Sequence, residues 1–138
     1  MENNSIFIEK LRSSGLRPTK QRIKICKLLF DREKTFHFTI NDLSKILKKE
    51  MSEKISLATI YNTVNSFKNK GYLKEISVNN DMSYFDTNTS NHHHFLDINT
   101  NELIDLKNED VHNIKIKKRI PGKKINSIEV LVKIENSN

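Results

Sequence analysis

Three consecutive histidines, His92, His93 and His94, are the residues of this chain that most directly suggest chemistry. They stand in NHHHFLDI (91–98), where the apolar residues that follow favour a strand. A strand directs successive side chains to opposite faces, so His92 and His94 would point one way and His93 the other. Short His-rich tracts are a compositional hint of metal binding. The triplet alone leaves a second interpretation open, a solvent-exposed polar turn that is rich in histidine.

The bulk properties of the chain limit where such a site could lie. Its 138 residues suggest one compact domain or two very small ones. The longest apolar runs are too short to span a bilayer, and no basic region followed by an apolar core begins the sequence. With Cys26 as its single cysteine, the chain cannot form an internal disulfide or a CxxC zinc site. We therefore expect a cytoplasmic protein.

Charge is distributed unevenly along the chain. Residues 1–74 contain 16 Lys and Arg against 7 Asp and Glu, whereas residues 75–138 contain 8 against 10. A basic half joined to a mildly acidic half indicates that the first half faces a polyanion. A generally lysine-rich proteome would explain the excess of lysine but not the asymmetry.

The first half has the hydrophobic periodicity of short helices. We expect one helix in 4–15, a second from Pro18 to Phe30, and a third in 38–50 with a cap at Thr39. Cys26 falls on the apolar side of the second helix and is expected to be a small buried hydrophobe.

The fourth predicted helix, ISLATIYNTVNSFKNKGYL (55–73), is the most informative. Ser56 can cap it, Ile55 and Ile60 can pack around that cap, and Gly71 can end it. The predicted core stripe consists of Leu57, Ile60, Val64 and Phe67. The other side is small, polar and almost uncharged, with Tyr61 at the edge of the stripe; it carries Ala58, Thr59, Asn62, Asn65, Ser66 and Asn69. Such a face suits a helix in a DNA major groove, although an asparagine-rich protein could present an ordinary polar face of this kind.

Two strand-like runs follow, 73–78 and 82–86, joined by NND (79–81) in the manner of a hairpin. Helices followed by a hairpin are the order of a winged helix-turn-helix, in which the last helix is the recognition helix.

The second half contains three more strand candidates, 92–98, 102–106 and 125–134, with a tight turn at 99–101. A three-stranded sheet this small buries little apolar area alone, so we expect it to pair with a second copy. Segment 107–124 is ambiguous between a short helix and a loop. The predicted class is α+β, with a winged helix-turn-helix DNA-binding domain at 1–87 and a small three-stranded α/β dimerisation and sensing domain at 91–138.

Four segments carry a resemblance to a known family: GLRPTKQR, SLATIYNTVNSFKNKGYL, SYFDTNTSNHHHF and ELIDL. They resemble the ferric uptake regulator (Fur) superfamily over about Leu11 to Ile134. The order YFDTN then HHH, without paired cysteines, looks most like its iron response regulator (Irr) subgroup. The resemblance implies a homodimeric, iron- or haem-responsive transcription regulator of iron-homeostasis genes, binding an AT-rich inverted repeat in double-stranded DNA.

The resemblance also implies DNA contacts. Arg17 would reach the minor groove, and Tyr61 would pack on thymine methyl groups or on the backbone, with Thr59 beside it. Many relatives carry arginine directly after that tyrosine. Asn62 stands there in this chain, which makes adenine a better partner than guanine.

The regulatory metal site of the family corresponds here to His37, Asp86, His92, His94 and Asp105. Imidazoles with carboxylates suit Fe(II), Mn(II) or Zn(II). A second metal or haem site would use His93 and His112, with Glu109 as a further candidate. Haem bound through a Cys-Pro motif is excluded, because Lys27 follows Cys26.

Three alternatives remain from the sequence. The same metal site could sense Mn(II), Zn(II) or peroxide. A metal-dependent hydrolase could use His92, His94 and Asp105, but no residue stands out as its general base, and it would leave the basic half unexplained. A non-specific DNA-packaging protein would not need the histidines and carboxylates. We therefore expect a regulator and not an enzyme.

Overall fold

The computed structural model describes residues 4–51, 54–79 and 81–138. The backbone divides into two compact units, residues 1–89 and residues 90–138. This division falls within the interval that the sequence left between its two predicted domains. The α+β class expected from the sequence is confirmed.

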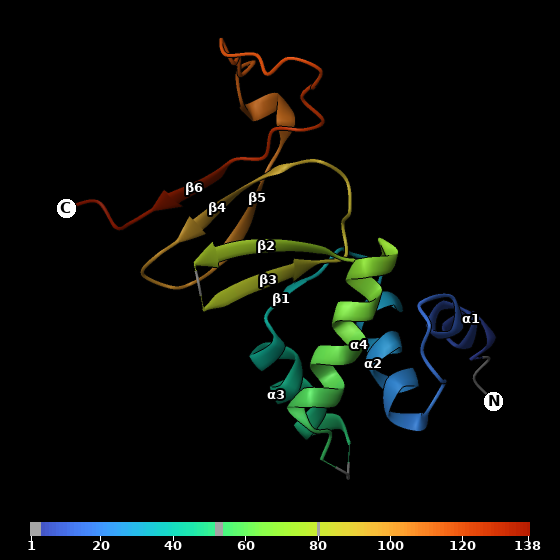
Figure 1. Ribbon diagram of the computed structural model, residues 1–138. Helices are drawn as coiled ribbons and strands as arrows, with labels where there is room; N and C mark the ends of the chain where they lie inside the picture. Colours follow the sequence, from blue (N-terminus) through green and yellow to red (C-terminus); the bar gives the residue numbers. More distant parts are fainter. Residues whose placement is uncertain (1–3, 52–53, 80) are drawn as a thin grey trace. The chain divides into compact units, whose positions relative to one another are not determined.

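Helices form most of the described part of the first unit (Figure 1). They are α1 (Ser5–Ser13), α2 (Lys20–Phe30), α3 (Ile40–Glu50) and α4 (Leu57–Lys70). The hydroxyls of Thr19, Thr39 and Ser56 each accept a hydrogen bond from a backbone N–H of the following first turn. At α3 the Asp42 carboxylate also accepts from the Thr39 N–H, which completes a capping box. The caps predicted at Thr39 and Ser56 are therefore confirmed.

The predicted end of α4 is also confirmed. Gly71 follows the helix with a φ of 93°, a left-handed backbone conformation that residues other than glycine rarely adopt. Its N–H and that of Tyr72 donate to carbonyls of the last helical turn, which satisfies acceptors that the helix itself leaves unpaired.

The predicted core stripe of α4 is wrong at one position. Ile60, Val64 and Phe67 are buried, but the side chain of Leu57 is 54% exposed. The reason is that Ile55, in the extended segment before the cap, is buried in the core at this end of the helix. Leu57, the first residue of the helix, therefore faces outward.

The first unit has one hydrophobic core, to which all four helices and the adjoining strands contribute. Its largest fully buried apolar side chains are Leu11, Ile25, Leu29, Phe38, Leu43, Leu47, Ile60, Val64 and Phe67. Cys26 is fully buried as well, as expected. The helices of the first unit are thus held together by apolar packing, and no described disulfide contributes.

A three-stranded antiparallel sheet accompanies the helices. Strands β2 (Lys74–Asn79) and β3 (Met82–Asp86) form the predicted hairpin, while its predicted turn residue Asn80 lies outside the described residues. A short strand β1 (His37–Phe38), which the sequence analysis did not predict, pairs with β3 on its other side. This strand places His37 directly opposite Asp86.

The second unit is built on a sheet in the order β5-β4-β6. Strand β4 (His93–Asp97) runs antiparallel to β5 (Leu103–Leu106) and parallel to β6 (Leu131–Ile134). The turn predicted after β4 is confirmed, since the Asp97 carboxylate accepts hydrogen bonds from the backbone of Asn99 and Thr100. The register places His94 directly opposite Asp105.

Between β5 and β6 the chain has little regular structure. A single turn of 3-10 helix, η1 (Asn108–Asp110), is followed by a segment without helix or strand, in which Ile114, Ile116, Ile120 and Ile125 are exposed. The ambiguous segment 107–124 is therefore mainly loop, and only the end of the predicted 125–134 strand pairs with β4. No described helix has the length and apolar character needed to cross a membrane.

Candidate functional site

In the first unit, a histidine and an aspartate face one another across two strands. His37 Nε2 lies 3.0 Å from Asp86 Oδ2, and the Asp86 side chain is fully buried. The other oxygen, Asp86 Oδ1, accepts a hydrogen bond of 2.8 Å from the backbone N–H of Asn88. A buried carboxylate must be paired or bind a cation, and these contacts orient it toward the imidazole.

Thr87 holds the strand of His37 in place. Its hydroxyl accepts a hydrogen bond of 2.9 Å from the Phe36 N–H, and its own N–H donates to the Phe36 carbonyl at 3.2 Å. These two bonds fix the entrance to β1 beside the end of β3, and thus fix His37 opposite Asp86.

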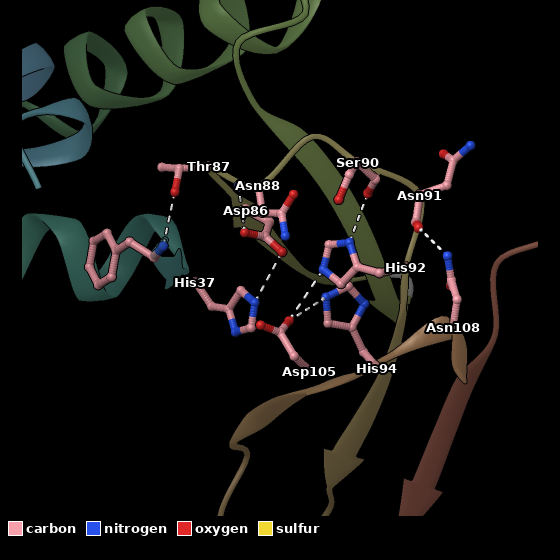
Figure 2. Close-up of polar contacts among 11 residues, drawn as sticks. His37, Asp86, Thr87, Asn88, Ser90, Asn91, His92, His94, Asp105 and Asn108 are labelled. Carbon is pink, nitrogen blue, oxygen red and sulfur yellow. Dashed lines mark hydrogen bonds and ion pairs between the residues drawn. The ribbon is translucent and has the colours of Figure 1, made fainter. Parts of the chain in front are cut away.

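In the second unit, two histidines converge on one carboxylate (Figure 2). His92 Nε2 and His94 Nε2 lie 3.2 and 3.4 Å from the same oxygen, Asp105 Oδ1. The two imidazole rings are neighbours, with centroids 4.3 Å apart. His94 is placed by the strand register, whereas His92 lies immediately before β4 and reaches the same point from the preceding segment.

The backbone determines which nitrogen of His92 carries a proton. His92 Nδ1 lies 2.7 Å from the Ser90 carbonyl oxygen, which can only accept, so Nδ1 is the donor. The neutral ring therefore has its lone pair on Nε2, the atom that faces Asp105. In most metal-ligating histidines, the ring N–H that does not face the metal donates a hydrogen bond to a carbonyl or a carboxylate in this way.

The spacing of these atoms fits a coordination shell. Ligand nitrogen and oxygen atoms lie about 2.0–2.2 Å from a bound transition metal, so two ligands of one ion are roughly 2.8–3.6 Å apart at angles between about 90° and 109°. The His–Asp separations of 3.0, 3.2 and 3.4 Å fall in this range. Each unit therefore offers donors suited to a divalent metal.

A side chain that is not itself a candidate ligand supports the group formed by His92, His94 and Asp105. Asn108 Nδ2 donates a hydrogen bond of 3.1 Å to the carbonyl of Asn91, the residue directly before His92 (Figure 2). Asn108 was not predicted from the sequence, nor were Thr87, Asn88 and Ser90. The run TNTSN (87–91) consists of residues that form local side-chain-to-backbone hydrogen bonds, which was the signal available for them.

The middle histidine of the triplet is used differently. His93 is buried, and its Nδ1 accepts a hydrogen bond of 3.0 Å from the backbone N–H of Val130. The ring proton is then on Nε2 and the lone pair of Nδ1 is engaged by Val130, so neither nitrogen is free to bind a metal. The predicted partner His112 and the candidate Glu109 are both exposed. The second site stays a prediction without geometric support.

The residues expected to contact DNA lie on the first unit. Arg17 is exposed before α2, and its carbonyl accepts a hydrogen bond of 3.0 Å from Arg22 Nη1. On α4, Tyr61 and Asn62 are exposed. Thr59 is less available, because its hydroxyl accepts a hydrogen bond of 2.9 Å from the Ser56 cap.

Comparison with known proteins gives a consistent result. Residues 13–133 match the ferric uptake regulator family. A curated relative, the peroxide-responsive repressor PerR of Staphylococcus aureus (strain Mu50 / ATCC 700699), is 32% identical over 108 residues, covering 78% of this chain and 71% of the relative.

Solved structures share the fold. The ferric uptake regulator of Pseudomonas aeruginosa with manganese superposes with a TM-score of 0.67 at 22% identity, covering 96% of this chain and 99% of that chain. The Vibrio cholerae ferric uptake regulator gives a TM-score of 0.69 at 20% identity, with 94% and 98% coverage. A zinc-bound manganese uptake regulator gives 0.62 at 22% identity, with 95% and 98% coverage.

Proposed function

The chain belongs to the ferric uptake regulator family, a family of metal-responsive transcription regulators, and we propose that Fe(II) or Mn(II) controls its binding to DNA. The chain is not an enzyme, because members of the family are regulators. The hydrolase considered from the sequence is therefore set aside.

The observation that carries the proposal is the convergence of His92 Nε2 and His94 Nε2 on a single oxygen of Asp105. Because the Ser90 carbonyl holds the proton of His92 on Nδ1, the nitrogen turned toward Asp105 is the one able to bind a metal. Imidazole nitrogens with carboxylate oxygens suit Fe(II), Mn(II) and Zn(II) more than a soft metal, which would favour thiolates.

His37 and Asp86 are the remaining ligands in the proposal. Asp86 precedes His92 by six positions, so the chain that joins them can extend by no more than about 20 Å. A metal bound by both groups would restrict the residues that link the two units. Metal binding would in this way limit the orientations of the DNA-binding unit, which is how we propose that the ligand set influences affinity for DNA.

DNA is bound, in this proposal, by the first unit with α4 as the recognition helix. Exposed Tyr61 and Asn62 would contact base edges in the major groove, and exposed Arg17 would contact the minor groove. Asparagine pairs with adenine, which supports an AT-rich operator. The second unit would join two copies into a homodimer, and the operator would then be an inverted repeat.

The test compares DNA binding with and without metal. Metal-free protein is first prepared, and Fe(II), Mn(II), Zn(II) or haem is then added in separate experiments. Each loaded protein is used to select a preferred duplex from a random pool. Affinity for that duplex is then measured for the wild type, Asp105→Asn and the control Asp97→Asn, whose side chain caps the turn after β4. We expect the response to metal to be lost in Asp105→Asn alone. An Asp105→Asn protein that responds as the wild type does would refute the ligand assignment.

A peroxide response is a second candidate, favoured by the similarity to the peroxide-responsive repressor of Staphylococcus aureus. It predicts that the iron-loaded protein loses DNA affinity on exposure to hydrogen peroxide, whereas the manganese-loaded protein keeps it. An iron-loaded protein that is indifferent to peroxide would favour a direct response to metal supply. Haem binding through His93 and His112 stays a prediction, which the haem arm of the selection tests.

A further inference from the structure

Two large apolar side chains lie exposed, one turn apart, on the outer face of α4. Leu57 and Tyr61 are each 54% exposed, and residues four positions apart on a helix are surface neighbours. Among the described residues of the first unit, Ile6 in α1 is the other large hydrophobic side chain that is strongly exposed. The pair is thus a local apolar surface in a unit whose other leucines are buried or partly buried.

The surroundings of this pair are basic on one side. Leu57 lines a groove of about 460 Å³ between α3 and the start of α4, together with Lys45, Lys48 and Lys54. All three lysines are exposed. On the other side Tyr61 lines a separate hollow with Glu75 and Asp81. The positive charge beside α4 therefore gathers next to Leu57.

The charge identifies the kind of partner that this surface fits. Two copies of a lysine-lined groove would repel one another, which argues against self-association through Leu57. A DNA strand has the opposite charge, and the major groove offers a compact apolar group, the C5-methyl of thymine. An apolar side chain flanked by lysines can contact that methyl while the lysines face the phosphates.

We propose that Leu57 acts with Tyr61 as a specificity-determining residue that recognises thymine methyl groups in the major groove. The inference rests on the proposed function, because it requires α4 to be the recognition helix. It adds a contact at the first residue of the helix, and it gives the exposure of Leu57 a role that packing does not provide. It predicts two thymines in each half-site, one facing each side chain.

The test removes single methyl groups from the DNA. In the duplex selected by the wild type, each thymine is replaced in turn by deoxyuridine, which lacks only the methyl group. Affinities are measured for the wild type, Leu57→Ala and Leu57→Met. We expect replacement of the thymine that faces Leu57 to weaken the wild type about three- to fivefold, the value of one buried methyl-sized group. Leu57→Ala should lose that sensitivity, and Leu57→Met should keep it.

Ile6→Ala is the matched control, since it removes an exposed apolar side chain from the same unit but from α1. It should retain the sensitivity of the wild type to every replacement. If the wild type and Leu57→Ala respond equally to all deoxyuridine duplexes, Leu57 does not read thymine, although the proposed function stands. If the wild type selects no preferred duplex, the proposed function fails and the inference fails with it.

Discussion

The backbone N–H of Val130 donates a hydrogen bond of 3.0 Å to Nδ1 of His93. The contact joins the start of β4 to the residue before β6, where the His94 N–H also donates to the Val130 carbonyl. His93 therefore holds the parallel edge of the second sheet, while its two neighbours turn toward Asp105.

Replacing His93 should consequently affect stability more than metal binding. His93→Ala leaves the partly buried N–H of Val130 without its acceptor, at a cost of roughly 1 kcal/mol. In His93→Asn the amide oxygen can take the place of Nδ1, so most of that stability should return. Denaturant unfolding and hydrogen exchange at Val130 measure the difference. Metal affinity equal to that of the wild type is expected in both variants, and its loss in His93→Asn would contradict this role.

The metal content of two variants tests whether one ion uses ligands from both units. If it does, His37→Ala and His94→Ala should each lower the affinity for the same ion. The loss should exceed the factor of about 10–100 that follows removal of a hydrogen-bond partner of a ligand. Equilibrium dialysis followed by elemental analysis gives the number of ions per protomer. Retention of a full metal complement in His37→Ala would mean that the histidines and carboxylate of the second unit bind an ion alone. Asp97→Asn is the control, because Asp97 caps the turn after β4 and belongs to neither proposed ligand set.

Much of the fold follows from local features of the sequence. The hydroxyl caps at Thr39 and Ser56, the glycine after α4 and the pairing of the two adjacent runs of the hairpin are interactions among near neighbours, so a single sequence reveals them. The prediction for Leu57 was wrong because helical periodicity indicates which face of a helix is buried but not where along the helix that burial ends. Ile55, outside the helix, took the position predicted for Leu57.

The pairing of the donors depends on the register between distant strands. His37 lies opposite Asp86, and His94 lies opposite Asp105, because of how β1 meets β3 and β4 meets β5. Residue types suggested metal chemistry, and the family resemblance named the five residues, but spacing alone could not join His37 to an aspartate so far along the chain. The two-residue strand β1 is too short to show any alternation.

Cys26 should be chemically inert in the folded protein. Burial raises the pKa of its thiol to about 11, although the charge of Lys10 opposes part of that rise. Because the thiolate is the reactive form, alkylation at pH 8 should be at least about 100-fold slower in the folded than in the unfolded protein. Labelling with iodoacetamide with and without guanidinium measures this ratio. Rapid labelling of the folded protein would show that Cys26 is accessible.

The ion pair between α4 and β2 should make a small, pH-dependent contribution to stability. Lys68 Nζ lies 2.7 Å from Glu75 Oε1. The hydrogen bond from Lys68 lowers the pKa of Glu75, although burial of the carboxyl opposes the shift. Since the folded state favours the ionised carboxylate, the stabilisation is present above the pKa of the unfolded chain, about 4.3, and is lost as pH falls through the folded value.

Glu75→Gln should therefore lower the free energy of unfolding at pH 7 by only about 0.2–1 kcal/mol, because the side chains are 37% and 29% exposed and solvent screens the pair. The difference from the wild type should shrink at about pH 3 and in about 1 M salt. Urea unfolding at both pH values and both salt concentrations provides the measurement. Glu33→Gln removes a carboxylate from an exposed loop position and controls for net charge. A difference that persists unchanged in acid would place the effect of Glu75 in packing and not in its ion pair with Lys68.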